Sequence, residues 1–114
     1  MRKQYYFRES SQGLLAWDVD RLVELSRALP RKMVPLSEIR ELYADPLNGA
    51  EHLRLIDEAD LSFPIILSAA GLVMDGRHRL AKAAREGRPE IAAVQFDEDP
   101  SPDFEGMGPD DLPY

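Results

Sequence analysis

Three short apolar runs, each followed by a turn or a helical segment, constrain the fold of this chain more than any other feature. Residues 63–68 form a continuous apolar run, residues 72–74 follow after a glycine-containing turn, and residues 91–96 form the third run. Runs of this length are typical of buried strands. Residues 77–86 have a helical pattern that ends at Gly87, and glycine commonly follows the last turn of a helix. The sequence therefore predicts a buried strand hairpin, a helix and a further strand.

A hairpin and a helix are predicted ahead of this core. Residues 4–9 are rich in aromatic side chains, residues 13–17 are mostly apolar, and turn-forming residues separate them, which predicts a hairpin. Asp18 is a good N-cap for a helix that extends to about Leu29. Pro30 ends that helix, because proline disfavours helical backbone in the residue before it.

The middle of the chain predicts shorter elements. Residues 33–36 have the pattern of a short strand, and Ser37 is a cap for a helical segment over 37–42. Residues 45–49 predict a loop, and residues 50–59 predict a helix. Together, these elements predict an α+β (mixed α/β) fold, in which a small mixed sheet is flanked by three or four helices.

The predicted N-terminal hairpin carries four aromatic side chains that have two interpretations. Packing in the core is the favoured role, since aromatic rings bury large apolar areas. A platform on which bases stack is the alternative, but Arg8 is the only basic residue among them. The four are Tyr5, Tyr6, Phe7 and Trp17.

The net charge of −7 is concentrated in a C-terminal tail. Residues 97–114 contain seven acidic residues, no basic residue and four prolines, whereas residues 1–96 contain 14 acidic and 14 basic residues. The tail is expected to be flexible or draped over the body, with a protein partner as its alternative use. The neutral body lacks the broad basic face of non-specific DNA binding, so nucleic acid is a less favoured partner.

Length and composition indicate one domain over residues 1–96, followed by the tail. A chain of 114 residues fits one domain. The absence of cysteine excludes disulfides, thiolate metal sites and thiol catalysis. The N-terminal segment lacks the apolar region of a signal peptide, and no apolar run approaches the roughly 18 residues that span a membrane. We therefore expect a cytoplasmic protein with no membrane partner.

The segment from Asp75 to Arg79 is the part of the sequence that points to chemistry. A strand leads into an Asp-Gly turn, and a helix then begins with Arg77, His78 and Arg79. The first N–H groups of a helix lack internal partners and bind phosphate well, and Gly76 allows close approach of the backbone. Arginine forks match phosphate oxygens, and histidine can donate a hydrogen bond or move a proton. The segment therefore predicts a phosphate-binding turn.

A salt bridge is the alternative interpretation of the same residues. On a helical wheel, Arg77 falls on the apolar side of the helix. An arginine there must pair with a carboxylate, extend past the strand ends or contact a ligand. Arg77 or Arg79 would then fix the hairpin to the helix, and Asp75 would be only the helix N-cap.

The remaining charged residues of this helix and the second histidine are assigned no functional role. Lys82 and Arg85 share a polar flank with His78 and are expected to be solvated helix charges. His52 lies in the predicted helix 50–59 without a partner at the spacing of metal ligands. We expect it to be a partly exposed helix residue, and no residue is assigned to a resident metal.

The run Gly76-Arg77-His78-Arg79, entered from the strand 72–74, resembles the signature of the ParB/sulfiredoxin-like superfamily. The segments 34–39 and 63–67 resemble earlier strands of that family, in the expected order. The resemblance covers about residues 33–96. It implies a ParB/sulfiredoxin-like fold to which the N-terminal hairpin and helix are added.

The resemblance implies a phosphate or nucleotide site at this turn. ParB partition proteins have a Gly-Glu-Arg-Arg motif that holds the phosphates of CTP, and sulfiredoxins have a Gly-Cys-His-Arg motif used with ATP. Gly76, His78 and Arg79 match the sulfiredoxin-type motif, whereas Arg77 replaces the catalytic cysteine. That difference excludes sulfiredoxin activity and argues against CTP hydrolysis of the ParB type. The chain also lacks room for ParB's other domains, so we do not expect partitioning by this chain alone.

Other members of the family are nucleases or small-molecule kinases, which leaves three functional hypotheses open. The first is binding of a small phosphorylated ligand or a nucleotide, with Mg²⁺ as an accompanying ion. The second is a phosphotransferase or nuclease on the same scaffold, with Glu38, Glu41 or His78 as catalytic candidates and Asp75 as a further carboxylate. The third is a non-catalytic protein-interaction module that uses the acidic tail.

Overall fold

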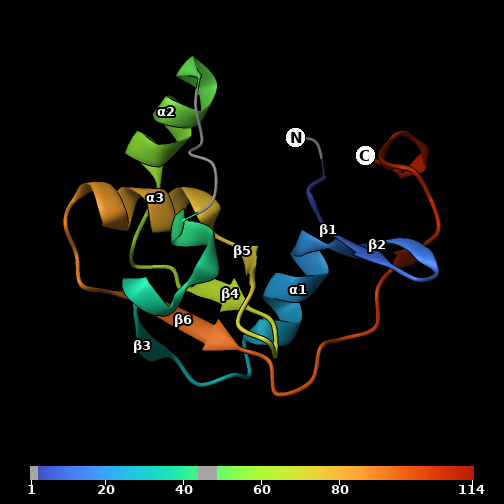
Figure 1. Ribbon diagram of the computed structural model, residues 1–114, viewed down its shortest axis with the longest axis horizontal. Helices are drawn as coiled ribbons and strands as arrows, with labels where there is room; N and C mark the ends of the chain where they lie inside the picture. The colour runs from blue at the N-terminus through green and yellow to red at the C-terminus, as the bar shows by residue number, and fades with distance from the viewer. Residues whose placement is uncertain (1–2, 44–48) are drawn as a thin grey trace.

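The computed structural model describes residues 3–43 and 49–114 and has an α+β fold built on a four-stranded mixed sheet (Figure 1). The strand order is β3-β6-β4-β5. Strand β6 is antiparallel to β3 and parallel to β4, and β5 is antiparallel to β4. The strands are β3 (Lys32–Pro35), β4 (Ile65–Leu67), β5 (Val73–Asp75) and β6 (Glu90–Gln95). The predicted α+β class is therefore confirmed.

A second, three-stranded sheet contains the two ends of the described chain. The predicted N-terminal hairpin is present as β1 (Tyr5–Ser10) and β2 (Gly13–Asp18). A short strand of the tail, β7 (Phe104–Glu105), pairs antiparallel with β2. Figure 1 shows this sheet beside the four-stranded sheet.

Three α-helices connect or cover the sheets. Helix α1 (Val19–Ser26) begins as predicted, because the Asp18 side chain accepts a hydrogen bond of 2.9 Å from the backbone N–H of Asp20. Helix α3 (Arg77–Arg85) ends before Gly87, which has a positive φ of 71°. The third, α2 (Ala50–Glu58), matches the helix predicted at 50–59.

The helical segment predicted at 37–42 is two separate 3₁₀ turns. These are η1 (Leu36–Glu38) and η2 (Arg40–Tyr43). Ile39 lies between them in extended conformation and is 1% exposed, so burial of this side chain takes precedence over a continuous helix. A third 3₁₀ turn, η3 (Pro109–Asp111), lies in the tail. Of the loop predicted at 45–49, all but the last residue lies outside the described residues.

The core is divided between the two faces of the four-stranded sheet. Alternate residues of a strand point to opposite faces, and Ile65 and Leu67 join one cluster whereas Ile66 joins the other. The first cluster includes Leu80 of α3, and the second includes Leu22 of α1. The sheet is therefore covered by α3 on one face and by α1 with the hairpin on the other.

The acidic tail packs against the N-terminal hairpin. The indole N–H of Trp17 donates a hydrogen bond of 2.7 Å to the carbonyl of Pro100. The backbone N–H of Asp103 donates to the carbonyl of Ala16 at 2.8 Å, and Leu112 is buried. Of the two expected states of the tail, flexible or draped over the body, the structure has the draped one. In the described part of the chain, no helix has the length and apolarity to cross a bilayer.

Candidate functional site

The turn that leads into α3 depends on glycine. Gly76 has a φ of +109°, a conformation that L side chains rarely adopt. A Cβ at this position would lie 2.6 Å from Cγ2 of Ile65 and 2.9 Å from Nη2 of Arg79. Gly76 is also the N-cap of α3, and no side chain in residues 3–43 or 49–114 caps this helix end. The interpretation of Asp75 as the N-cap is therefore wrong.

Asp75 instead pairs with the second arginine of the helix. Nη2 of Arg79 lies 3.0 Å from Oδ2 of Asp75, and the two side chains are 20% and 23% exposed. The Nε of Arg79 is buried and has no hydrogen-bond partner in the described residues. The predicted salt bridge thus exists for Arg79, where it ties the end of β5 to the first turn of α3.

Arg77 is the charged residue of this turn whose side chain remains available to bind a ligand. Its side chain is exposed, although its position on the wheel is on the apolar side of the helix. It forms no hydrogen bond or ion pair with any residue in 3–43 or 49–114. Of the three outcomes predicted for Arg77, a carboxylate partner is not found among the described residues, which leaves extension past the strand ends or contact with a ligand.

His78 contacts the other histidine of the chain. Its Nε2 lies 3.0 Å from Nδ1 of His52 on α2, and the two rings are nearly parallel with centroids 5.2 Å apart. A hydrogen bond between two ring nitrogens needs one donor and one acceptor, so at least one ring is neutral. His52 is partly exposed on α2, as expected, and its contact with His78 is a feature that the sequence did not indicate. No sequence signal identifies this pair, because the residues are 26 positions apart and on different helices.

The surroundings of His78 favour its neutral form. Burial lowers the pKa of His78 below its ordinary value, and the charges of His52, Arg77 and Arg79 lower it further. Asp75 acts in the opposite direction but is outweighed. A neutral imidazole at neutral pH has one N–H donor and one acceptor, which suits it for hydrogen bonding to a ligand or for accepting a proton.

Lys82 and Arg85 attach α3 to the end of α2. Nζ of Lys82 donates to the carbonyls of Asp57 and Ala59 at 2.9 and 2.7 Å. Arg85 forms an ion pair of 2.7 Å with the Asp57 carboxylate. Both residues were expected to be solvated charges. Arg85 is solvated as expected, with its side chain 48% exposed, whereas Lys82 is partly buried and satisfies carbonyl groups at a helix C-terminus, where a cation is favourable.

The two glutamates proposed from the sequence lie in different places. Oε2 of Glu41, on η2, accepts a hydrogen bond of 2.7 Å from the backbone N–H of Val73 on the edge strand β5. Its Oε1 is buried and has no hydrogen-bond partner among the described residues. Glu38 is exposed and lines a separate hollow along β3. The structure therefore brings Glu41, but not Glu38, next to the turn at Gly76.

An open pocket of about 1040 Å³ connects the turn with the N-terminal hairpin. Its lining includes residues 75–79, Glu41 and four aromatic residues that we call the aromatic wall. The aromatic wall consists of Tyr5, Tyr6, Phe7 and Tyr114. Three of these belong to the hairpin of the sequence prediction, whereas Tyr114 comes from the tail and no sequence signal placed it here.

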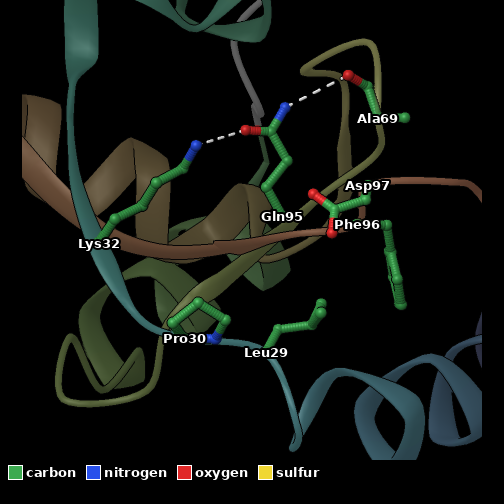
Figure 2. Close-up of a pocket in the computed structure, with 7 residues that line it drawn as sticks. All are labelled: Leu29, Pro30, Lys32, Ala69, Gln95, Phe96 and Asp97. Carbon is green, nitrogen blue, oxygen red and sulfur yellow. Dashed lines mark hydrogen bonds between the residues drawn. The ribbon is translucent and has the colours of Figure 1, made fainter.

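A smaller hollow of about 360 Å³ lies at the other end of the sheet (Figure 2). It is located where the parallel strands β4 and β6 end, and two of its polar side chains, Lys32 and Gln95, bind each other. Lys32 donates to the side-chain oxygen of Gln95, whose amide nitrogen donates to the carbonyls of Ser68 and Ala69. Because these groups form hydrogen bonds with one another, the hollow has fewer polar groups available to bind a ligand than the pocket at Gly76.

Within the part of the chain that the structure describes, no three His, Cys, Asp or Glu side chains are grouped so that they could hold a metal ion. No protein-family model, curated protein or solved structure matches this chain. The ParB/sulfiredoxin-like resemblance of residues 33–96 therefore stays a prediction from the sequence.

Proposed function

We propose that this protein binds a phosphate group or a nucleotide at the start of α3, with Gly76, Arg77, His78 and Arg79 as a phosphate cradle. The observation that carries the proposal is the exposed guanidinium of Arg77, which lies at the start of α3; the described residues provide neither an ion-pair partner for Arg77 nor a side-chain cap for this helix. An uncapped helix N-terminus offers N–H groups and positive potential, and a guanidinium matches two phosphate oxygens. The ParB/sulfiredoxin-like resemblance also implies a phosphate site at this turn.

The other members of the turn have supporting roles in this proposal. Asp75 is a carboxylate and would repel a phosphate directly, so its role is to hold Arg79 through the 3.0 Å ion pair. His78, neutral at neutral pH, donates a hydrogen bond to a phosphate oxygen. Gly76 keeps the backbone close to the ligand, because no Cβ stands between them. The cytoplasmic location expected from the sequence is part of the proposal.

Thermal unfolding in the presence of candidate ligands tests this function. The purified protein is titrated with inorganic phosphate, ATP, CTP and GTP, with and without Mg²⁺. A ligand that binds only the folded state at a hundredfold excess over its Kd stabilises the protein by about 2.7 kcal/mol, and the melting temperature rises accordingly. We expect this rise to disappear in Arg77→Ala.

The control is Arg27→Ala, which removes an exposed arginine at the α1 C-terminus whose ion pair is with the exposed Glu24. This variant removes the same charge, so it reports the general effect of net charge on anion binding. Equal loss of the ligand effect in both variants would contradict a site at Arg77. If none of the ligands raises the melting temperature, the proposed function is wrong.

A phosphotransferase or nuclease on the same scaffold is the second candidate, and Glu41 is the observation that favours it. Its Oε1 is a buried carboxylate oxygen without a partner in the described residues, and Glu41 lines the pocket that contains Arg77 and His78. A carboxylate near a phosphate can act as a base or contact a Mg²⁺ that arrives with the nucleotide. Mg²⁺-dependent turnover that is lost in Glu41→Gln but kept in Glu38→Gln would support this candidate.

The acidic tail gives weaker support to the interaction-module alternative. Asp99 pairs with Arg8 and Asp103 pairs with Arg21 within the molecule. Two of its seven acidic residues are thus already engaged by the hairpin and α1. Phosphate or nucleotide binding at the turn is therefore the function we favour.

A further inference from the structure

We propose that His52 and His78 form a pH-sensitive latch, which holds the N-terminal part of α2 on α3 and releases it when both rings are protonated. This inference goes beyond the proposed function, because it concerns the position of a helix and needs no ligand. The observation behind it is the 3.0 Å contact between Nδ1 of His52 and Nε2 of His78, which joins the first turn of α2 to the first turn of α3. The contact exists only while the two helices are packed together.

Helix α2 depends on its attachments to α3. It is nine residues long, and isolated helices shorter than about 12–15 residues are marginal in water. Of residues 50–58, Ile56 alone is buried, and Leu53 is 52% exposed. The N-cap is Gly49, and no side chain in the described part of the chain caps this end. The helix packs mainly against α3, and Figure 1 shows it projecting from the body of the molecule.

The attachments at the two ends of α2 differ in their response to pH. At the C-terminal end, Lys82 donates to the carbonyls of Asp57 and Ala59, and Arg85 pairs with the Asp57 carboxylate. At the N-terminal end, the attachment is the histidine pair. Histidine is the side chain that ordinarily changes its charge between about pH 5 and 8. Acid in this range therefore acts on the N-terminal attachment and leaves the C-terminal one in place.

The number of protons on the pair decides whether the contact forms. When both rings are neutral, or when one is protonated, one nitrogen can donate and the other can accept. When both rings are protonated, both nitrogens are donors, so no hydrogen bond joins them and the two positive charges repel each other. The closed arrangement therefore excludes the second proton, whereas separated rings each bind one.

The surroundings of His78 act in the same direction. Burial lowers the pKa of His78 below its ordinary value, and three positive groups lower it further, while one carboxylate acts in the opposite direction. The positive groups are His52, Arg77 and Arg79, and the carboxylate is Asp75. From the other elements packed against α3, Glu41 of η2 and Glu58 of α2 line the same pocket as His78. The net effect of these groups is a lowered pKa of His78.

The sign of the pH effect follows from this difference between the closed and open states. Release of α2 removes the charge of His52 and part of the burial from His78, so the open state binds protons more readily. Helix α2 is therefore held on α3 above about pH 6.5 and is released as the pH falls further. Because Leu55 of α2 lines the pocket that also contains His78, release of α2 opens this pocket on one side.

Hydrogen exchange of backbone amides tests the latch. Protection factors, which correct for the intrinsic exchange rate at each pH, are measured by NMR for residues 53–58 of α2 and, as an internal reference, for residues 80–85 of α3. We expect the protection of α2 to fall at least about tenfold between about pH 7.5 and about pH 5, because opening coupled to the uptake of one proton changes tenfold per pH unit. Protection of α3 should change less. Parallel changes in both helices, or an α2 without protection at about pH 7.5, would overturn the inference.

Variants of the two histidines separate the latch from a general effect of acid. In His52→Gln, the amide has both a donor and an acceptor, so it can stay in contact with His78 at either charge, and α2 should keep its protection in acid. His78→Gln should give the same result from the side of α3. Arg85→Ala is the matched control, because it removes the C-terminal ion pair and should lower the protection of α2 by the same factor at both pH values. If both histidine variants retain the wild-type fall in protection, the inference is wrong.

Discussion

Two regions of the molecule use arginine in opposite ways. At the hairpin, the Arg8 guanidinium lies 3.0 Å from the Asp99 carboxylate and 4.9 Å from the ring centroid of Trp17. Arg21 of α1 likewise pairs with Asp103 at 2.9 Å. At the start of α3, Arg77 is exposed and has no ion-pair partner among the residues the structure describes.

The difference separates structural charge from charge that is available to a ligand. Arg8 and Arg21 hold the tail on the hairpin, so their charges are compensated within the fold. Arg77 stabilises nothing that the structure describes, although it follows a turn whose backbone conformation favours glycine and begins a helix that no described side chain caps. An arginine kept in such a place fits a role in binding better than a role in stability. The following predictions test that distinction.

The largest effect is expected at the glycine that shapes the turn. Gly76→Ala places a Cβ 2.6 Å from Ile65 in a backbone conformation that alanine rarely adopts, and we expect a loss of about 3 kcal/mol of stability. Urea unfolding measures it. Gly87→Ala is the matched control, because Gly87 also has a positive φ but no atom within 4 Å of the added Cβ, so its cost is about 1 kcal/mol. Equal costs for the two variants would show that the packing at Gly76 is looser than described.

Removing the arginine of the hairpin should be the next most costly change. Arg8→Ala deletes the ion pair with Asp99 and the stacking on Trp17 and Tyr6, and we expect a loss of roughly 2 kcal/mol in urea unfolding. The tail should also become more sensitive to proteolysis. A change within about 0.5 kcal/mol would mean that the tail is not held by this contact, and the contrast with Arg77 would lose its basis.

The histidine pair predicts a dependence of stability on pH. The folded state lowers the pKa of His78 below its ordinary value of about 6.5, whereas the unfolded state leaves it there. The neutral ring therefore contributes stability that is fully present above about pH 6.5 and is lost as the pH falls further, because the unfolded state binds the extra proton more readily. The melting temperature of the wild type should fall more steeply between pH 7.5 and 5 than that of His78→Gln. Parallel curves would contradict the burial of a neutral His78.

The smallest effect on stability is expected for Arg77. Because this side chain is exposed and has no described ion-pair partner, Arg77→Ala should change the free energy of unfolding by less than about 0.5 kcal/mol. The comparison with Arg8→Ala under the same conditions makes this small value informative. A loss as large as that of Arg8→Ala would assign Arg77 a structural role and weaken the proposed site.

Local signals in the sequence predicted much of the fold. The Asp18 cap, the hairpin at 4–17 and the glycine that ends α3 depend on residues close together in the chain, and all three are confirmed. The short strands were located to within two residues for the same reason. The continuous helix expected at 37–42 is absent because the burial of Ile39, a tertiary effect, decides the local conformation.

Contacts between distant segments could not be predicted from the sequence. The sequence identified the turn at 75–79. It did not show that Asp75 pairs with Arg79 or that Arg77 is exposed. The partnership of His52 with His78 and the position of Tyr114 in the pocket require the packing of α2 and of the tail. Periodicity describes which face of an element is apolar, and it does not specify which element covers that face.

The most direct test of the proposed site is to map where a nucleotide binds. Two-dimensional ¹H–¹⁵N NMR spectra of the wild-type protein are recorded during a titration with ATP or CTP. We expect the largest shifts at the backbone amides of Gly76, Arg77, His78 and Arg79, smaller shifts on β1, and none of comparable size around Gln95 at the other end of the sheet. Shifts concentrated around Gln95, or no shifts at residues 76–79 at a saturating nucleotide concentration, would contradict a phosphate cradle at the start of α3.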